Sequence, residues 1–380
     1  MFPTQFTGAS FTWERKKLGI YVPITMGQSP NSKNYTNNPR DNILVQGNAD
    51  LYNNRVLKRT FTTEVTKIAD RNDILISVRA PVGDIARNQY ESIVIGRGIA
   101  AIKGNNFLYY QLEKMNNSGF WKKYIAGSTF ESITGKDLKS SDIYISNHKE
   151  EKSIGDIFQT LTKTIQLHED HLQFLHSFKS FLLQKMFFDN DIPPLLRFNK
   201  FTEKWNQCKL NDHTIVTMGQ SPNSKNYTNN QTGKILVQGN ADLYKNKILK
   251  RVFTTEVTKT AVKNDILISV RAPVGDIARN QYESVVIGRG IASIKGNDFL
   301  YYQLEKMKNN GFWNKYIAGS TFESITGKDL KNTKIYTTNS DEERKIGNIF
   351  SSLTKIIQLQ EHKIDSLKKL KQFLLQNMFI

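Results

Sequence analysis

The chain has 380 residues and a formal net charge of +18 at pH 7, which favours polyanionic partners such as nucleic acid or an anionic membrane surface. No apolar run approaches the roughly 18 residues that span a bilayer, and the opening MFPTQFTGAS lacks the basic and apolar segments of a signal peptide. The single cysteine, Cys208, excludes an internal disulfide framework. We therefore expect a cytoplasmic protein without a membrane partner.

The chain repeats itself at a fixed spacing. The stretch MGQSPNSKNYTNN begins at Met26 and again at Met218, so the spacing is 192 residues (218 − 26). With that shift the two halves match without insertion or deletion over roughly 13–188 and 205–380. The connecting segment Asp189–Lys204 contains two consecutive prolines, which mark a non-helical break. Each copy is long enough to fold around a core of its own.

The first part of each copy reads as a mixed domain of short strands and helices. Runs of β-branched and aliphatic residues bounded by turn formers predict strands. In the first copy, the predicted strands are Asn42–Val45, Ile74–Val78, Ile85–Ala86, Ser92–Ile95, Ile99–Ile102 and Asp142–Ile145. Helices are predicted at Asn106–Asn116 and at Gly119–Ala126. The pattern indicates an α+β domain with a mainly antiparallel sheet, and the second copy repeats it.

The end of each copy predicts one long helix. In the first copy it spans Ser153–Phe188, and apolar residues recur along it in steps of three and four, which is a seven-residue seam. The seam residues are Ile154, Phe158, Leu161, Ile165, Leu172, Leu175, Leu182 and Met186, repeated as Ile346, Phe350, Leu353, Ile357, Ile364, Leu367, Leu374 and Met378. Since one helix cannot hide such a stripe alone, we expect the two helices to pair in an antiparallel coiled coil. The alternative is that each helix packs only on its own domain.

These elements predict an α+β architecture with pseudo-two-fold symmetry, in which two mixed α/β globular domains are separated by the two paired helices. The predicted boundaries are a first domain at 1–150, a first helix at 151–188, a linker at 189–204, a second domain at 205–342 and a second helix at 343–380.

The repeat also limits the chemistry. No histidine or cysteine occupies the same position in both copies, which excludes a shared zinc site or Cys/His nucleophile. The Gly96-Arg97-Gly98 stretch is a weak dinucleotide signal, and no GxxxxGK[ST] phosphate loop is present. No Asn-Pro-Pro-Tyr or Asp-Pro-Pro-Tyr motif of amino-methyltransferases occurs. Asp73, Asp84 and Glu91 recur in both copies without the order of a nuclease site, so a structural or solvated role is favoured.

Hydrogen-bond donors, by contrast, recur in both copies. Arg and Lys suit phosphates and guanine edges, and Asn and Gln match adenine edges. The recurring donors include the polar loop from Gln28 to Tyr35, the Gln46-Gly47-Asn48 stretch, and Arg79, Arg87, Asn88, Arg97, Lys122, Lys123 and Lys136, with Tyr52, Tyr90, Phe120, Trp121 and Tyr124 between them. Ordinary turns are the alternative explanation, but a turn needs only two or three such residues. A loop repeated in full favours a binding function.

A family resemblance sharpens this hypothesis. The order domain, helix, domain, helix occurs together with GQSPNSKNY, DILISVRAPVGDIA, IGRGIAAIKG, GSTFESITGKDLK and the helix ends LLQKMFF and LLQNMFI. Nearly the whole chain, in both of its copies, closely resembles the specificity subunit of type I restriction–modification systems. The resemblance implies two target recognition domains on double-stranded DNA and two conserved spacer helices that dock two methyltransferase (modification) subunits, with restriction subunits bound through them.

The resemblance further implies a non-catalytic subunit that binds no cofactor itself. S-adenosylmethionine, ATP and Mg²⁺ would be used by the partner subunits, and the modified base would be adenine. The family usually carries two different recognition domains, whereas these two are nearly identical. We therefore predict a gapped, palindromic DNA target.

DNA contacts are predicted for residues of the polar loop and the basic positions that come after it. They are Gln28, Ser29, Asn31, Ser32, Lys33, Tyr35, Gln46, Asn48, Arg79, Arg97, Ser128 and Lys136, with Gln220, Ser221, Asn223, Ser224, Lys225, Tyr227, Gln238, Asn240, Arg271, Arg289, Ser320 and Lys328 in the second copy. Two alternatives remain open: a stand-alone DNA-acting enzyme such as a nuclease, and a non-specific basic coiled-coil scaffold. Cleavage by the pure chain with Mg²⁺ would favour the first, and binding without sequence preference the second.

Overall fold

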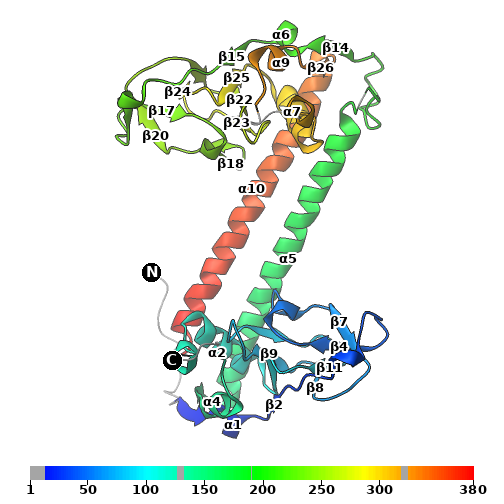
Figure 1. Ribbon diagram of the computed structural model, residues 1–380, viewed down its shortest axis with the longest axis vertical. Coiled ribbons are helices and arrows are strands. Elements are labelled where there is room, and N and C mark those ends of the chain that lie inside the picture. Colours follow the sequence, from blue (N-terminus) through cyan, green and yellow to red (C-terminus); the bar gives the residue numbers. More distant parts are fainter. Residues whose placement is uncertain (1–12, 126–131, 190, 318–323) are drawn as a thin grey trace. The chain divides into compact units, whose positions relative to one another are not determined.

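The computed structural model describes residues 13–125, 132–189, 191–317 and 324–380. The chain divides into two compact units (Figure 1). Unit 1 comprises Met1–Glu169 together with His362–Ile380, and unit 2 comprises Asp170–Glu361. Each unit therefore contains the globular part of one copy and a stretch of both long helices.

Short strands and helices make up the globular part of unit 1. Its strands are β1 (Glu14–Lys17), β2 (Ile24–Met26), β3 (Tyr35–Thr36), β4 (Asn42–Val45), β5 (Leu51–Tyr52), β6 (Arg55–Val56), β7 (Thr60–Thr62), β8 (Ile68–Asp70), β9 (Ile74–Ser77), β10 (Ile85–Arg87), β11 (Ser92–Ile95), β12 (Ile99–Ile102) and β13 (Asp142–Ile145). Its α-helices are α1 (Leu18–Tyr21), α2 (Asn106–Asn117), α3 (Lys122–Ile125) and α4 (Gly135–Ser140), and its 3₁₀ turns are η1 (Ser32–Asn34) and η2 (Asn48–Asp50).

Two sheets and one strand pair organise these strands. One sheet has the order β2-β12-β9-β10-β6-β5, the other has the order β3-β7-β4-β11-β8, and β1 pairs with β13. Neighbouring strands are antiparallel except β6 with β10 and β4 with β11. The predicted α+β domain with a mainly antiparallel arrangement is confirmed. The split into two sheets was not predicted, because strand periodicity does not say which strands pair.

Strand β9 lies between two hydrophobic cores of unit 1 and contributes side chains to both. Ile74 and Ile76 belong to the core shared with α2 and the long helices. Leu75, between them, belongs to a second core that includes Val45 of β4 and Ile95 of β11. A strand covered on both faces has no polar side, which accounts for the unbroken apolar run in the sequence.

Unit 2 repeats this arrangement. Its strands are β14 (Asn206–Lys209), β15 (Val216–Met218), β16 (Tyr227–Thr228), β17 (Lys234–Val237), β18 (Leu243–Tyr244), β19 (Lys247–Ile248), β20 (Val252–Thr254), β21 (Thr260–Val262), β22 (Ile266–Ser269), β23 (Ile277–Arg279), β24 (Ser284–Ile287), β25 (Ile291–Ile294) and β26 (Lys334–Thr337). Its helices are α6 (Leu210–His213), α7 (Asp298–Asn309), α8 (Asn314–Ile317) and α9 (Gly327–Lys331), with the 3₁₀ turns η3 (Ser224–Asn226) and η4 (Asn240–Asp242). The sheets have the orders β15-β25-β22-β23 and β16-β20-β17-β24-β21, and β18 pairs separately with β19.

The two long helices are α5 (His148–Met186) and α10 (Ser340–Asn377). Both begin earlier than the apolar seam indicated, because a preceding asparagine caps each of them. The Asn147 side chain accepts a hydrogen bond from the Glu150 backbone N–H at 3.0 Å, and Asn339 accepts one from Asp341 at 2.8 Å.

Within each unit the two helices run antiparallel, as predicted. In unit 1 the rings of Phe158 and Phe379 stack with centroids 5.6 Å apart, while Lys368 forms an ion pair with Glu169. In unit 2, Leu175 clusters with Leu353 and Ile357. The helices also pack on the globular cores, so pairing with the other helix and packing on a domain are not alternatives here.

The seam residues differ in how deeply they are buried. The buried seam residues are Ile154, Phe158, Ile165, Leu175 and Met186 of α5, and Ile346, Phe350, Leu353, Ile357 and Ile364 of α10. Leu161, Leu172, Leu182, Leu367 and Leu374 are half-buried. Toward the helix ends the deeper positions are Leu183 and Leu375, because the globular cores cover a face beside the seam.

Candidate nucleic-acid interface

The polar loop between β2 and β3 is fastened to the turn between β11 and β12. The Gly27 backbone N–H donates to the Ile99 carbonyl and that of Gln28 to the Ile95 carbonyl, both at 2.9 Å. A Cβ at Gly27 would lie 2.1 Å from the Gly96 carbonyl oxygen, so only glycine permits this approach. Gly219 stands in the same position in unit 2, where the distance is 2.2 Å.

Glu64 organises the tip of this loop. Its Oε2 accepts hydrogen bonds from the Asn31 backbone N–H at 2.8 Å and from Asn34 Nδ2 at 2.7 Å. The bond from the Asn34 side chain and that from the Asn31 backbone hold the pKa of the Glu64 carboxyl below its usual value. Glu256 accepts the same two bonds from Asn223 and Asn226 in unit 2.

Hydrogen bonds bring the other predicted residues to this loop. Arg97 donates its backbone N–H to Ser29 Oγ at 3.1 Å, and the Tyr35 hydroxyl donates to Gln46 Oε1 at 3.2 Å. The Gly98 N–H donates to the Gln46 carbonyl at 3.1 Å, which places the short turn η2 beside the same loop. Unit 2 repeats the bonds from Arg289 to Ser221 and from Tyr227 to Gln238.

Arg79 lies at the edge of this group. The Val78 N–H donates to the Gly98 carbonyl at 2.9 Å, and the next residue, Arg79, forms an isolated bridge with Ser132. The Arg79 side chain is exposed, as are the side chains of Arg97 and Lys33.

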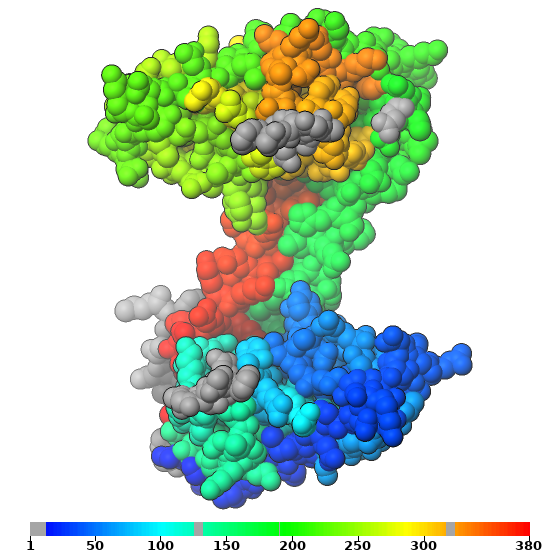
Figure 2. All heavy atoms as spheres, in the orientation of Figure 1, coloured from blue at the N-terminus to red at the C-terminus, as the bar shows by residue number. Residues whose placement is uncertain are grey.

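We call this surface the polar face. In unit 1 it consists of Gln28, Ser29, Asn31, Ser32, Lys33, Tyr35, Gln46, Asn48, Arg79 and Arg97, and in unit 2 of Gln220, Ser221, Asn223, Ser224, Lys225, Tyr227, Gln238, Asn240, Arg271 and Arg289. Figure 2 shows the segment that carries most of it as a continuous blue lobe of unit 1.

Lys136 lies close to the base of the loop. It belongs to α4, whose Gly135 would meet the Met26 side chain at 3.0 Å if it carried a Cβ. Lys136 shares a surface hollow of about 660 Å³ with Lys17 and Lys139. Lys328 has the same place beside Lys209 and Lys331 in a hollow of about 530 Å³. The predicted contacts Ser128 and Ser320 lie outside the described residues.

Other recurring donors are structural. Arg87 donates to the Asn72 carbonyl at 2.6 Å and lies over the Tyr109 ring, so its guanidinium holds the sheet to α2. Asn88 is fully buried and donates to the Ala69 and Asp70 carbonyls. Trp121 is 2% exposed and belongs to the core. Sequence alone does not separate these inward-facing groups from outward-facing ones, because both recur in the two copies.

Three residues with contacts in or near this region were not predicted from the sequence. Glu64 fixes the loop, Arg59 donates to the Ala49 carbonyl at 2.8 Å beside Asn48, and Lys58 lies 4.5 Å from the centroid of the Tyr90 ring. Each is the same residue in the second copy, as Glu256, Arg251 and Lys250. This identity between the copies is the sequence feature that could have pointed to these residues, although it does not distinguish them from the rest of the repeat.

The described residues contain no group of three or more His, Cys, Asp or Glu side chains that could hold a metal ion. Among the helices in the same described ranges, none is long and apolar enough to cross a membrane.

An aromatic row lies on the part of α5 that belongs to unit 2. Phe174, Phe178 and Phe181 are 62%, 41% and 48% exposed. Their spacing of four and three places them on one helix face, and the first two rings stack with centroids 6.0 Å apart. The equivalent positions of α10, in unit 1, carry Ser366, Leu370 and Phe373.

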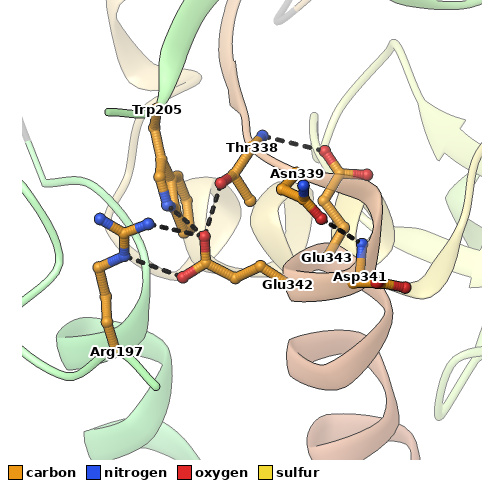
Figure 3. A network of polar contacts seen from close by, with 7 residues as sticks. All are labelled: Arg197, Trp205, Thr338, Asn339, Asp341, Glu342 and Glu343. Atoms are coloured by element: carbon orange, nitrogen blue, oxygen red, sulfur yellow. Dashed lines mark hydrogen bonds and ion pairs between the residues drawn. The ribbon is translucent and has the colours of Figure 1, made fainter. Parts of the chain in front are cut away.

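The linker after α5 is fastened to unit 2 by a buried carboxylate (Figure 3). Arg197 donates to both oxygens of Glu342, from Nε at 2.9 Å and from a terminal nitrogen at 2.8 Å. Trp205 Nε1 and Thr338 Oγ1 donate to the same carboxylate at 3.1 Å and 2.6 Å.

The chain is similar to a known protein family, to curated proteins and to solved structures. The family described as Type I restriction modification DNA specificity domain matches residues 11–176 and 202–369. A putative type I restriction enzyme MjaX specificity subunit from Methanocaldococcus jannaschii is 36% identical over 167 residues, which is 41% of this chain and 38% of that protein. The MjaIX specificity subunit of the same organism is 27% identical over 126 residues, which is 31% of this chain and 28% of that protein. The chain thus spans well under half the length of these curated relatives.

Two solved structures share the fold. A type I restriction–modification S subunit from M. genitalium has a TM-score of 0.69 at 16% identity, with 100% of this chain and 99% of that chain covered. A chain from a study of complex assembly and conformational transition of the type I R-M system has a TM-score of 0.59 at 20% identity, with 97% of this chain and 98% of that chain covered. At these identities the likeness establishes the fold.

Proposed function

Since the chain belongs to the family of type I restriction–modification DNA specificity domains, we propose that it binds duplex DNA sequence-specifically through the polar face of each unit. One observation carries the proposal: the same amide, hydroxyl and basic side chains gather on one surface in both units, held by the same hydrogen bonds. Backbone contacts fix this surface before any ligand binds, which lowers the ordering cost of recognition.

The DNA target proposed is a gapped inverted repeat. Two faces with the same residues read the same short word, and a two-fold relation between them would present that word on opposite strands. The near-identity of the two copies supports this, because the residues of the polar face do not differ between them.

Selection from randomised duplex DNA at moderate salt tests the proposal. The wild-type chain should enrich a gapped palindrome. Changing Arg79→Ala and Arg271→Ala together should relax one base position in each half-site, with a loss of ~1–3 kcal/mol per site if the arginine contacts guanine. The charge-matched control is Lys163→Ala with Lys355→Ala, two exposed helical lysines at equivalent positions.

Other outcomes would count against the proposal in different ways. Two unrelated half-words would overturn the palindrome and keep sequence-specific binding. Equal weakening on all sequences would make the arginines phosphate contacts. If no sequence is enriched and binding vanishes at higher salt, the chain is a basic scaffold. DNA cleavage by the pure chain with Mg²⁺ would make it an enzyme instead.

We further propose that the aromatic row on α5 and its counterpart on α10 each dock a methyltransferase (modification) subunit. Three phenylalanines 41% to 62% exposed on one helix face would be unfavourable in water, and aromatic side chains are enriched at protein interfaces. In this proposal the chain is non-catalytic, restriction subunits join through the methyltransferases, and S-adenosylmethionine, ATP and Mg²⁺ bind to those partners. The complex would act in the cytoplasm.

The two copies provide the docking test. Phe174→Ser with Phe178→Leu converts the row on α5 into the residues found on α10. Titration with a type I modification subunit from the same source, followed by native mass spectrometry, should show two bound copies for the wild type and weaker binding of one copy for the variant. The matched control is Ser366→Phe with Leu370→Phe, which should strengthen the other copy. Unchanged binding in both variants would place docking elsewhere.

A further inference from the structure

Val65 is an exposed apolar residue next to the polar face. It is 57% exposed, and Val257 at the equivalent position of unit 2 is 56% exposed. It lies in the connection between β7 and β8, immediately after Glu64. Since Glu64 holds Asn31 and Asn34, Val65 stands beside the loop that carries Gln28, Asn31 and Lys33.

The backbone around Val65 is held on both sides. Thr63 donates its N–H to the Asn34 carbonyl at 3.1 Å, and the Glu64 N–H donates to Thr62 Oγ1 at 3.1 Å. After Val65, the Thr66 hydroxyl donates to the Gln28 carbonyl. Unit 2 repeats the bonds of Thr255, Glu256 and Thr258.

A rigid apolar side chain at this place suits one feature of DNA. Valine is branched at Cβ and has few rotamers, so little freedom remains to be lost when it makes a contact. The 5-methyl group of thymine is the apolar group that base pairs present in the major groove, and the minor groove presents none. An adenine edge read by Asn or Gln lies beside the methyl group of its paired thymine.

We propose that Val65 and Val257 each contact the 5-methyl group of a thymine in the major groove, one in each half-site, and so select an A·T pair next to the amide-reading loop. The proposal rests on the proposed function, since it assumes that the polar face reads DNA. The apolar contact of each valine would add specificity for thymine to that supplied by the hydrogen-bond donors of the polar face.

Replacing thymine by deoxyuridine removes only this methyl group. In the word obtained by selection, each thymine is replaced in turn, in both half-sites together, and binding is measured for the wild type and for the variant Val65→Ala with Val257→Ala. For the wild type, one position should weaken binding by about fourfold per half-site, the amount expected for one methyl-sized group. The variant should bind the thymine and deoxyuridine duplexes equally at that position.

Two controls separate this contact from other effects. Leu167→Ala with Leu359→Ala removes two helical side chains that are 69% and 60% exposed, and it should keep the wild-type sensitivity to deoxyuridine. The valine variant should unfold at the wild-type temperature, because exposed substitutions have little effect on the fold.

Each remaining outcome overturns the inference. If wild type and variant lose the same affinity with deoxyuridine, or if the enriched word has no A·T pair whose methyl group matters, Val65 reads no thymine and the proposed function still holds. If no word is enriched at all, the proposed function fails first and this inference fails with it.

Discussion

In unit 1 the place beside Trp13 and Phe107 is filled by Phe379 from the end of α10, with ring centroids 6.2 Å and 5.2 Å away. In unit 2 the equivalent place beside Trp205 and Phe299 is filled by Phe187 from the end of α5, at 6.4 Å and 5.2 Å. Each globular core is therefore completed by the helix that belongs to the other copy. A sequence repeat is thus not the same as a folding unit.

Two ion pairs likewise join the helix of one copy to the globular part of the other copy. Lys371 of α10 forms an ion pair with Glu113 in unit 1, and Lys179 of α5 forms one with Glu305 in unit 2, both at 2.8 Å. These four side chains are 11% to 17% exposed. A pair so well covered fixes the rotation of each helix end on its core, because its removal would leave a charge without a partner.

The units differ beyond the end of the helix that completes each core. In unit 1, Lys114 Nζ donates to the Phe379 carbonyl at 3.1 Å and to the Ile380 carbonyl at 2.7 Å. In unit 2 its counterpart Lys306 donates to the carbonyl of Phe188, the position equivalent to Ile380. Lys306 also forms an ion pair with Asp189 at 3.3 Å. The linker then continues to Arg197, which forms an ion pair with Glu342 of α10. Position 5, which corresponds to Arg197, carries glutamine and lies outside the described residues. Unit 2 thus has an ion pair with Glu342 that a glutamine could not form.

The largest expected effect on stability comes from replacing Phe187 and Phe379, the two phenylalanines that each pack in the core of the other copy. Phe187→Ala and Phe379→Ala should each lower the free energy of unfolding by ~3–5 kcal/mol, because the rings are 1% and 5% exposed in aromatic cores. Denaturant titration followed by hydrogen exchange would assign each loss to one unit. Phe181→Ala, an exposed position of the same helix, is the control and should change stability by less than ~0.5 kcal/mol. If both core variants resemble the control, the helix ends are not parts of these cores.

A smaller loss is expected when the linker is released from unit 2. Arg197→Ala leaves the Glu342 carboxylate, which is fully buried, without its ion-pair partner and should destabilise unit 2 by about 2 kcal/mol. Unit 1 should be unaffected in the same hydrogen-exchange experiment. The matched variant is Glu150→Gln, at the position equivalent to Glu342, where a smaller change is expected. Equal effects of the two would show that the linker adds nothing to unit 2.

Acid offers a second measurement of the same contact. Burial raises the pKa of the Glu342 carboxyl, but hydrogen bonds from Arg197 and Thr338 and the Arg197 charge outweigh it, so the pKa lies below its usual value. A lowered pKa in the folded state contributes stability above the unfolded-state pKa of about 4.3, and this stability is lost as the pH falls through the folded value. Between about pH 5 and pH 3 the wild type should therefore lose more stability than Arg197→Ala. Parallel curves would contradict this.

The smallest expected effect concerns the hairpin of β18 and β19. Lys245 forms an ion pair with Glu361 at 3.1 Å, whereas the corresponding residue of unit 1 is Asn53. Lys245→Asn should cost less than ~0.5 kcal/mol, because the two side chains are 57% and 31% exposed. Hydrogen exchange in this hairpin should then match that of β5 and β6. A loss above ~1 kcal/mol would mean that the pair fixes the domain to the helix.

Much of the fold was predictable from local pattern. The strands at Asn42–Val45, Ser92–Ile95, Ile99–Ile102 and Asp142–Ile145 occur with the predicted bounds. Short strands such as β5 and β6, and the helix α4, were missed because they have too few residues for a periodic signal. For the candidate site, the polar loop lies at the surface, and its role in DNA binding stays a prediction. Arg87, Asn88 and Trp121, which were predicted as part of the same surface, have structural contacts instead.

The sequence by itself determined the duplication, the alternation of domain and helix, and the apolar stripe along each helix, because these depend on residue order alone. Only the tertiary structure decided that Phe187 completes the core of the second copy and Phe379 that of the first. It alone decided that Glu64 organises the polar loop and that Val65 stands exposed beside it. The physical reason is that periodicity identifies which side of an element must be covered, whereas the residues that cover it are set by contacts between positions far apart in the chain.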